Sequence, residues 1–173
     1  MPLNVSAQIV WAGDIPDAPG GLAEKIGELA KSGANLEFVI ARRRPEEPGK
    51  GVVFVSPVKG KAAEDAASGA GLRKAMDVPT LRVEGPDSPG IGDRMLRAIA
   101  ELGINLRGVS AAAIDGKFVT YIGFYHAHEA SRAAEALRAL DVGKSAKTGA
   151  KTRKSAGKTS RKTAKSAKTK RRR

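Results

Sequence analysis

Cysteine is absent from the 173 residues of the chain, which excludes disulfides, thiolate nucleophiles and cysteine-bound metals. The N-terminus lacks the basic segment and apolar run of a secretory signal. No apolar stretch approaches the roughly 20 residues that a membrane-spanning helix needs. We therefore expect a cytoplasmic protein that does not insert into a membrane.

Recognisable catalytic patterns are missing as well. No Ser-His-Asp set or pair of carboxylates stands out in the sequence. Gly90 and Gly92 resemble the start of a dinucleotide-binding fingerprint, but Met95 stands where the third glycine belongs. His126 and His128 could share a metal ion, yet no third ligand accompanies them. We predict that the protein is not an enzyme and needs no cofactor or metal.

Acidic residues are missing from the last segment, residues 143–173, which contains 9 Lys and 5 Arg. Residues 1–142 contain the other 17 basic residues and all 18 acidic residues, so their charges nearly cancel. The net charge of +13 therefore comes from this tail. The tail also lacks aromatic and branched aliphatic residues. Because such a segment cannot bury enough apolar area to offset the entropy of ordering, we predict that it is disordered.

A polycationic tail of this kind predicts binding to an anionic polymer. Phosphate backbones are favoured because their condensed counterions are released on binding, and contacts of this type do not select a sequence. The alternative is a tail that only increases solubility. The expected DNA- or RNA-binding residues are Lys144, Lys147, Lys151, Arg153, Lys154, Lys158, Arg161, Lys162, Lys165, Lys168, Lys170, Arg171, Arg172 and Arg173.

A 26-residue pattern occurs twice, at residues 14–39 and 84–109, with an offset of 70 positions. Each copy has Asp-x-Pro-Gly, then apolar residues at helical spacing, then Gly-x-Asn at the start of an extended run. The same offset places Phe54 on Phe124 in the run that follows. Two copies of one structural unit are the simplest explanation.

Each copy reads as a strand, a helix, two strands and a helix. This order predicts an α+β fold with two ferredoxin-like βαββαβ units in tandem. We place the first domain at residues 1–76 and the second at residues 77–142, followed by the tail. Ser88 precedes Pro89 at the start of the second copy's helix and is expected to cap its first turn.

The strands at the ends of the copies are the least defined. Alternation in residues 5–12 predicts a single first strand for copy one. Its fourth strand has to fit within residues 72–83, where copy two also begins. For copy two, almost nothing remains after Leu140 from which a fourth strand could be formed.

Residues 118–125 have apolar side chains on both faces of the predicted strand, which indicates that both faces are covered. The two tyrosines of this run, Tyr121 and Tyr125, would lie on the face opposite its two phenylalanines. Since each copy is small and buries a modest core, we expect the copies to pack together as one continuous structure.

The repeated pattern of Asp-x-Pro-Gly, helix and Gly-x-Asn resembles the ACT domain family, and the two copies resemble tandem ACT proteins. The resemblance extends over residues 5–140. It implies a βαββαβ unit in each copy and a regulatory protein that holds an amino acid at the interface between two such units. Some serine-binding members have a polar residue two places before the Asp, where this chain has Ile15 and Gly85.

The residues themselves suit a zwitterionic ligand. Free N–H groups at the start of a helix favour a carboxylate, and glycines let a ligand approach the backbone. The resemblance implies that the Asp and Asn of each copy hold the ligand's polar groups. The expected ligand-binding residues are Asp17, Gly20, Gly21, Asn35, Asp87, Gly90, Ile91, Gly92 and Asn105.

A structural role is the alternative at several of these positions. Asp87 could stabilise only its own turn, and Asn105 only the turn after Gly103. The arginines at residues 42–44 are predicted to form a solvated strand end. Two functions remain open: a regulatory protein that binds an amino acid, and a nucleic-acid-associated protein whose ACT-like body dimerises or binds another protein. In either case we expect a homo-oligomer.

Overall fold

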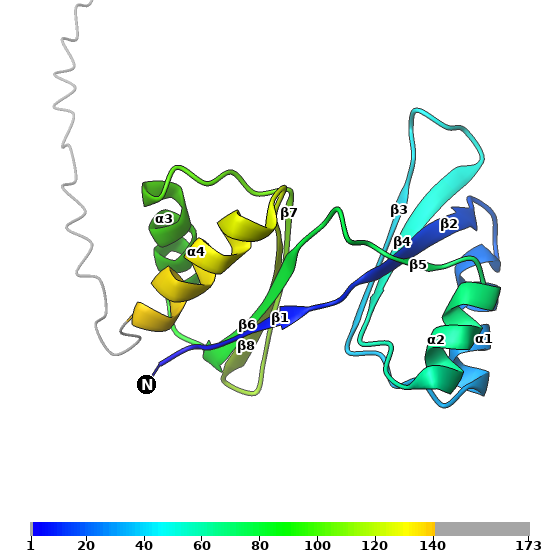
Figure 1. The fold of residues 1–173 in the computed structure, drawn as a ribbon, viewed down its shortest axis with the longest axis horizontal. Helices are drawn as coiled ribbons and strands as arrows, with labels where there is room; N and C mark the ends of the chain where they lie inside the picture. The colour runs from blue at the N-terminus through cyan, green and yellow to red at the C-terminus, as the bar shows by residue number, and fades with distance from the viewer. Residues whose placement is uncertain (1, 141–173) are drawn as a thin grey trace, which may run out of the picture.

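Two α+β units form the part of the protein that the structure, a computed structural model, describes, residues 2–140 (Figure 1). Each unit has a four-stranded antiparallel sheet with two helices on one side. In chain order the elements are β1 (Asn4–Gln8), β2 (Trp11–Pro16), α1 (Gly21–Lys31), β3 (Phe38–Arg43), β4 (Lys50–Ser56), α2 (Lys61–Gly69), β5 (Arg73–Lys74), β6 (Thr80–Pro86), α3 (Ile91–Glu101), β7 (Gly108–Ile114), β8 (Lys117–Gly123) and α4 (Ala127–Ala139).

The sheets have equivalent strand orders, β3-β4-β2-β5 in the first unit and β7-β8-β6-β1 in the second. Helices α1 and α2 cover the outer face of the first sheet, and α3 and α4 cover the outer face of the second (Figure 1). The uncovered faces of the two sheets therefore point toward each other. The α+β, ferredoxin-like architecture predicted from the sequence is confirmed.

Separate hydrophobic cores lie between each sheet and its helices. In α3 the buried residues are four positions apart, so one face of the helix packs on the sheet. The first core contains Trp11, Ile15, Leu29, Val53, Val55, Val58, Ala63, Ala67 and Leu72. The second core contains Leu3, Val5, Leu81, Val83, Ile91, Met95, Ile99, Ile104, Phe118, Ile122, Phe124, Ala130, Ala133, Ala134 and Leu137.

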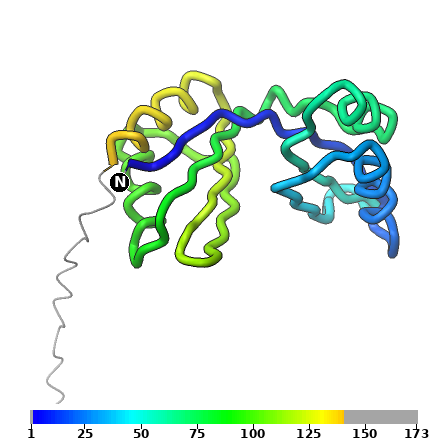
Figure 2. The backbone as a smooth tube through the Cα atoms, turned by 90° about the horizontal axis from the view of Figure 1, so that it is seen from below, coloured from blue at the N-terminus to red at the C-terminus, as the bar shows by residue number. Residues whose placement is uncertain are grey.

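The N-terminal segment belongs to both units, and this corrects the prediction of one strand over residues 5–12. The chain forms β1, which pairs with β6 of the second sheet, and then β2, which pairs with β4 of the first. Figure 2 shows the blue N-terminal segment passing from one unit into the other. β1 is thus the fourth strand for which copy two has no residues after Leu140. β5 is the fourth strand of copy one, within the predicted range.

The two hairpins differ in length, which corrects the predicted correspondence between Phe54 and Phe124. Phe38 pairs with Ser56, 18 positions on, whereas its counterpart Gly108 pairs with Gly123, 15 positions on. Copy one therefore has three extra residues in its turn, and the offset of 70 does not continue beyond it. The true counterpart of Phe54 is Tyr121, and both lie on the uncovered sheet faces.

The prediction that the Ser88 side chain caps the start of α3 is also wrong. The helix begins at Ile91, with Gly90 as the N-cap in a left-handed conformation, and no side chain caps it. Among the described residues, the buried Ser88 hydroxyl has no hydrogen-bond partner. Its backbone carbonyl instead accepts a hydrogen bond from the Ile91 N–H at 3.1 Å.

The two units touch where their uncovered faces meet. The rings of Phe38 and Tyr121 are 4.3 Å apart between centroids. Beside them, Arg82 Nε lies 3.4 Å from Glu37 Oε2, an ion pair whose atoms are not aligned for a hydrogen bond. Tyr121 is 6% exposed, so its face of β8 is covered as the sequence predicted.

No helix within residues 2–140 is both long and apolar enough to cross a bilayer.

Candidate functional site

The Asp-x-Pro-Gly corners have the same backbone geometry in both copies. Gly20 and Gly90 are the N-caps of α1 and α3, with φ of 92° and 82°. The Asp17 N–H donates to the Gly49 carbonyl at 3.0 Å, and the Asp87 N–H donates to the Gly116 carbonyl at 2.8 Å. Each Asp is therefore held against the tip of its unit's hairpin, next to a helix start without a side-chain cap.

The carboxylates of the two corners have different surroundings. Asp17 Oδ1 lies 3.0 Å from Nε of Arg43, and its side chain is 30% exposed. The residue equivalent to Arg43 in copy two is Ala113, which has no charge. Within the described part of the chain, the Asp87 side chain has no hydrogen bond or ion pair. Only the second corner therefore presents a carboxylate that is free to receive a cation.

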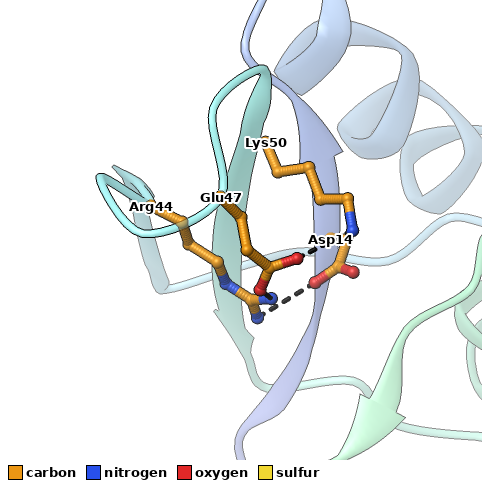
Figure 3. A network of polar contacts seen from close by, with 4 residues as sticks. All are labelled: Asp14, Arg44, Glu47 and Lys50. Carbon is orange, nitrogen blue, oxygen red and sulfur yellow. Dashed lines mark hydrogen bonds and ion pairs between the residues drawn. The ribbon is translucent and has the colours of Figure 1, made fainter.

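The longer hairpin of copy one is held together by ion pairs (Figure 3). Arg44 contacts Asp14 at 3.0 Å and Glu47 at 3.1 Å, and Lys50 contacts Glu47 at 2.7 Å. The hydrogen bond and charge of Lys50, together with Arg44, lower the pKa of Glu47. This network fixes the turn that contains Gly49, the hydrogen-bond partner of Asp17. Of the three arginines predicted to form a solvated strand end, Arg43 and Arg44 thus have carboxylate partners.

The glycines of the corners do not share one role. A Cβ on Gly21 would lie 2.5 Å from the Pro16 carbonyl oxygen, so packing within the unit already requires a glycine there. Gly92 has open space around its Cβ position. Ile91, the third residue of the predicted set in copy two, is 6% exposed and belongs to the core.

The motif asparagines lie at the other ends of the same helices. Asn35 and Asn105 follow α1 and α3, each of which has 11 residues. At about 1.5 Å per residue, such a helix is about 16 Å long. One amino acid therefore cannot contact the Asp and the Asn of the same copy. The Asn105 side-chain oxygen accepts a hydrogen bond from the Leu106 N–H at 3.0 Å. This local contact fits the alternative in which Asn105 stabilises only the turn after Gly103.

A cavity of about 160 Å³ lies between the two sheets and contains none of the predicted ligand-binding residues. Phe38, Ile40 and Arg42 line it from β3, because alternate residues of a strand share a face. The second unit contributes Arg107, Ser110 and Tyr121, among others. The full lining is Val10, Phe38, Ile40, Arg42, Phe54, Val78, Thr80, Arg107, Gly108, Val109, Ser110, Tyr121 and Gly123.

No family model and no curated protein sequence matches the chain. Solved structures do. The ligand-free regulatory subunit of aspartate kinase from Thermus thermophilus is 22% identical, with a TM-score of 0.54, over 79% of this chain and 95% of that one. The corresponding subunit from Thermus flavus is 21% identical, with a TM-score of 0.52, over 79% and 95%. Protein BT0572 from Bacteroides thetaiotaomicron is 14% identical, with a TM-score of 0.64, over 79% and 99%.

The chain has a tandem ACT-type fold. The similarity covers nearly the whole length of these three structures and includes both units. At this level of identity it establishes the fold.

Within the tandem ACT-type fold, sequence reasoning missed the residues between the sheets. The alternation of Phe38, Ile40 and Arg42 was a usable signal, because it gives the uncovered face of β3 two apolar residues and one charge. Arg107 and Tyr121 had no comparable signal. Arg107 donates to the Asp77 carbonyl and, at 2.9 Å, to the Asp77 carboxylate.

Arg82 is a charged residue at the contact between the ACT-type units. Burial lowers the pKa of Arg82, while the Tyr121 hydroxyl and the Glu84 carboxylate raise it, and the net pKa is above the ordinary value. Its Nη1 lies 2.8 Å from Glu84 Oε2. Arg82 therefore stays charged and is neutralised locally.

The histidine pair has a structural role. His126 is the N-cap of α4 and forms a capping box with Glu129, whose carboxylate accepts the His126 N–H at 3.0 Å. The His126 and His128 rings stack with centroids 5.4 Å apart. Among residues 2–140 there is no group of three potential metal ligands. The predicted nucleic-acid-binding residues of the tail all lie outside this range.

Proposed function

We propose that the protein is a regulatory protein that binds an amino acid at an interface between ACT-type units. The observation that carries the proposal is the Asp87 carboxylate, which has no partner in the described structure and lies beside the uncapped start of α3. An unpaired carboxylate accepts the ammonium group. The helix start, with its N–H groups and positive end, favours the carboxylate of the same ligand.

The contrast between the two copies makes the second corner the stronger ligand site. Arg43 already neutralises Asp17, so an ammonium group there would compete with a guanidinium. Asp87 has no such competitor. Since Asn105 lies a helix length away, the remaining contacts come from another unit, and we propose that a second copy of the chain supplies it.

The regulatory role is supported by the solved structures with the same fold. Two of them are regulatory subunits of aspartate kinase. We propose that this chain likewise transmits the binding of its ligand to another protein.

The test is a thermal-shift screen of the full chain against the twenty amino acids, followed by calorimetry. A ligand at 100 times its dissociation constant stabilises the fold by about 2.7 kcal/mol. Asp87→Asn should abolish the shift. Asp17→Asn is the matched control, because it changes the same motif position where Arg43 already occupies the carboxylate. The proposal fails if no amino acid binds at millimolar concentration, or if the two variants weaken binding equally.

A further inference from the structure

The cavity between the two sheets has the features of a second ligand site, independent of the Asp87 corner. We propose that it binds a small carboxylate whose body is a single ring or a branched alkyl group. Its lining is mostly apolar and includes Phe38, Ile40 and Phe54 from the first unit and Val109 and Tyr121 from the second. Such a lining takes up the apolar body of a ligand, while a few polar groups orient it.

The charged group that fixes the orientation is Arg42. It is on the same face of β3 as Phe38 and Ile40, is exposed, and makes no hydrogen bond or ion pair with any described residue. Its two neighbours, Arg43 and Arg44, both have carboxylate partners. A free guanidinium at the edge of an apolar cavity matches a carboxylate, which it contacts through two parallel hydrogen bonds.

Further polar groups line the cavity from the second unit. The Arg107 guanidinium is held in place by its ion pair with Asp77 at 2.9 Å, and its remaining N–H groups can donate hydrogen bonds. The Ser110 hydroxyl has no partner within residues 2–140 and can donate to an anion. The Thr80 hydroxyl already donates to the Val78 carbonyl at 2.8 Å. The donors that remain thus favour an anionic group.

The same lining discriminates against amino acids. It contains two arginines and no aspartate or glutamate, so no carboxylate in it would pair with an ammonium group. Burying an unpaired ammonium beside guanidinium groups is unfavourable. The preferred ligand therefore has a carboxylate without a neighbouring amine, which separates this site from the one at Asp87.

The volume limits the size of the ligand. An apolar cavity of about 150 Å³ accommodates benzene. The cavity here, at about 160 Å³, holds a body of similar size with the carboxylate at Arg42. A bound ligand would contact both units, so it would strengthen a junction otherwise made by Phe38, Tyr121 and the Glu37–Arg82 pair.

The test uses benzoate as the probe on the full chain, with binding measured by calorimetry and by NMR chemical shifts. Benzamide has the same body without the charge, and L-phenylalanine adds an ammonium. We expect benzoate to bind saturably, with at least about tenfold weaker binding for benzamide and L-phenylalanine.

Two variants locate the site. Arg42→Gln should weaken benzoate binding about tenfold or more, whereas Arg43→Gln, the matched control on the opposite face of β3, should not. Gly108→Val places a side chain where a Cβ meets open space, and should block binding without unfolding the protein. Thermal unfolding of each variant checks the fold.

The proposal is overturned if benzoate does not saturate by about 10 mM, which is weaker than any ordinary specific affinity. It is also overturned if benzamide binds as well as benzoate, or if Arg42→Gln and Arg43→Gln behave alike. Failure of the amino-acid screen leaves this result unaffected, because the two sites share no residue.

Discussion

Phe38 of β3 and Tyr121 of β8 join the two ACT-type units through their rings, with centroids 4.3 Å apart and an interplanar angle of 31°. The pair lies beside the cavity and beside the ion pair of Glu37 with Arg82. Because the two rings are in contact, a substitution of one of them changes the packing of the other unit's surface.

A double-mutant cycle should measure that coupling. We expect Phe38→Ala and Tyr121→Ala to be non-additive by about 0.5–1.5 kcal/mol in the free energy of unfolding, the range of paired aromatic rings. Urea denaturation of the four proteins is the measurement. Tyr125→Ala is the control, since Tyr125 is 52% exposed. Strict additivity would show that the rings do not stabilise the junction.

Substitutions at Leu3, directly before β1, or within β1 should destabilise the second unit. Leu3 is 4% exposed and packs in the second unit's core, so Leu3→Ala should cost about 2 kcal/mol or more. Hydrogen exchange should become faster at Leu81 and Val83 of β6 and stay unchanged at Val53 of β4. Ile9→Ala, at a position 55% exposed, is the control. Faster exchange in β4 alone would contradict the pairing of β1 with β6.

Two glycine substitutions should change the stability of the protein in opposite directions. Gly21→Ala forces a Cβ to within 2.5 Å of the Pro16 carbonyl oxygen and should destabilise the protein by more than about 1 kcal/mol. Gly92→Ala meets no atom and should stabilise α3 by up to about 1 kcal/mol. Thermal unfolding distinguishes them. A Gly21→Ala variant as stable as the wild type would show that the Pro16 carbonyl can move away from the added Cβ.

The hairpin network in Figure 3 should depend on pH at both extremes. The pKa of Glu47 lies below its ordinary 4.5, so its contribution to stability is present above pH 4.5 and is lost as pH falls through the folded-state pKa. The Lys50 pKa lies above 10.5, because of the hydrogen bond and charge of Glu47, so its contribution is present below pH 10.5 and is lost at higher pH.

An NMR titration of the Glu47 carboxyl checks this assignment. Lys50→Gln should raise the pKa of Glu47 toward 4.5, because the hydrogen bond and charge of Lys50 are the main causes of its lowering. Lys61→Gln, which removes the partner of Asp65 on α2, should leave it unchanged. An unchanged Glu47 midpoint in Lys50→Gln would show that the pair does not persist in solution.

Much of the fold could be predicted because the repeated pattern contains local signals. Apolar spacing defined α1 and α3, and the left-handed glycines defined their boundaries. The pairing of β1 with the second sheet could not be predicted, since the alternation in residues 5–12 runs on across the end of β1 and the start of β2 and nothing local assigns them to different sheets. The predicted correspondence between Phe54 and Phe124 was wrong because the turn of copy one is three residues longer than that of copy two. The counterpart of Phe54 is therefore Tyr121.

The candidate site was only partly visible in the sequence. The repeat identified Asp17 and Asp87 as equivalent positions, but their different charge environments depend on Arg43, which comes from another strand. The cavity depends on how two sheets face each other. That arrangement is set by contacts such as Phe38 with Tyr121, which join residues 83 positions apart in the chain.

The placement of β1 has a consequence for the order in which the protein is made. On the ribosome β1 emerges before the first unit, yet its partner β6 appears only after the whole first unit has been synthesised. The Arg138 side chain, which donates to the Val5 carbonyl at 3.0 Å, appears later still. The first unit can therefore fold cotranslationally. The second unit has to pair β6 with the earlier-synthesised β1 before its own sheet is complete.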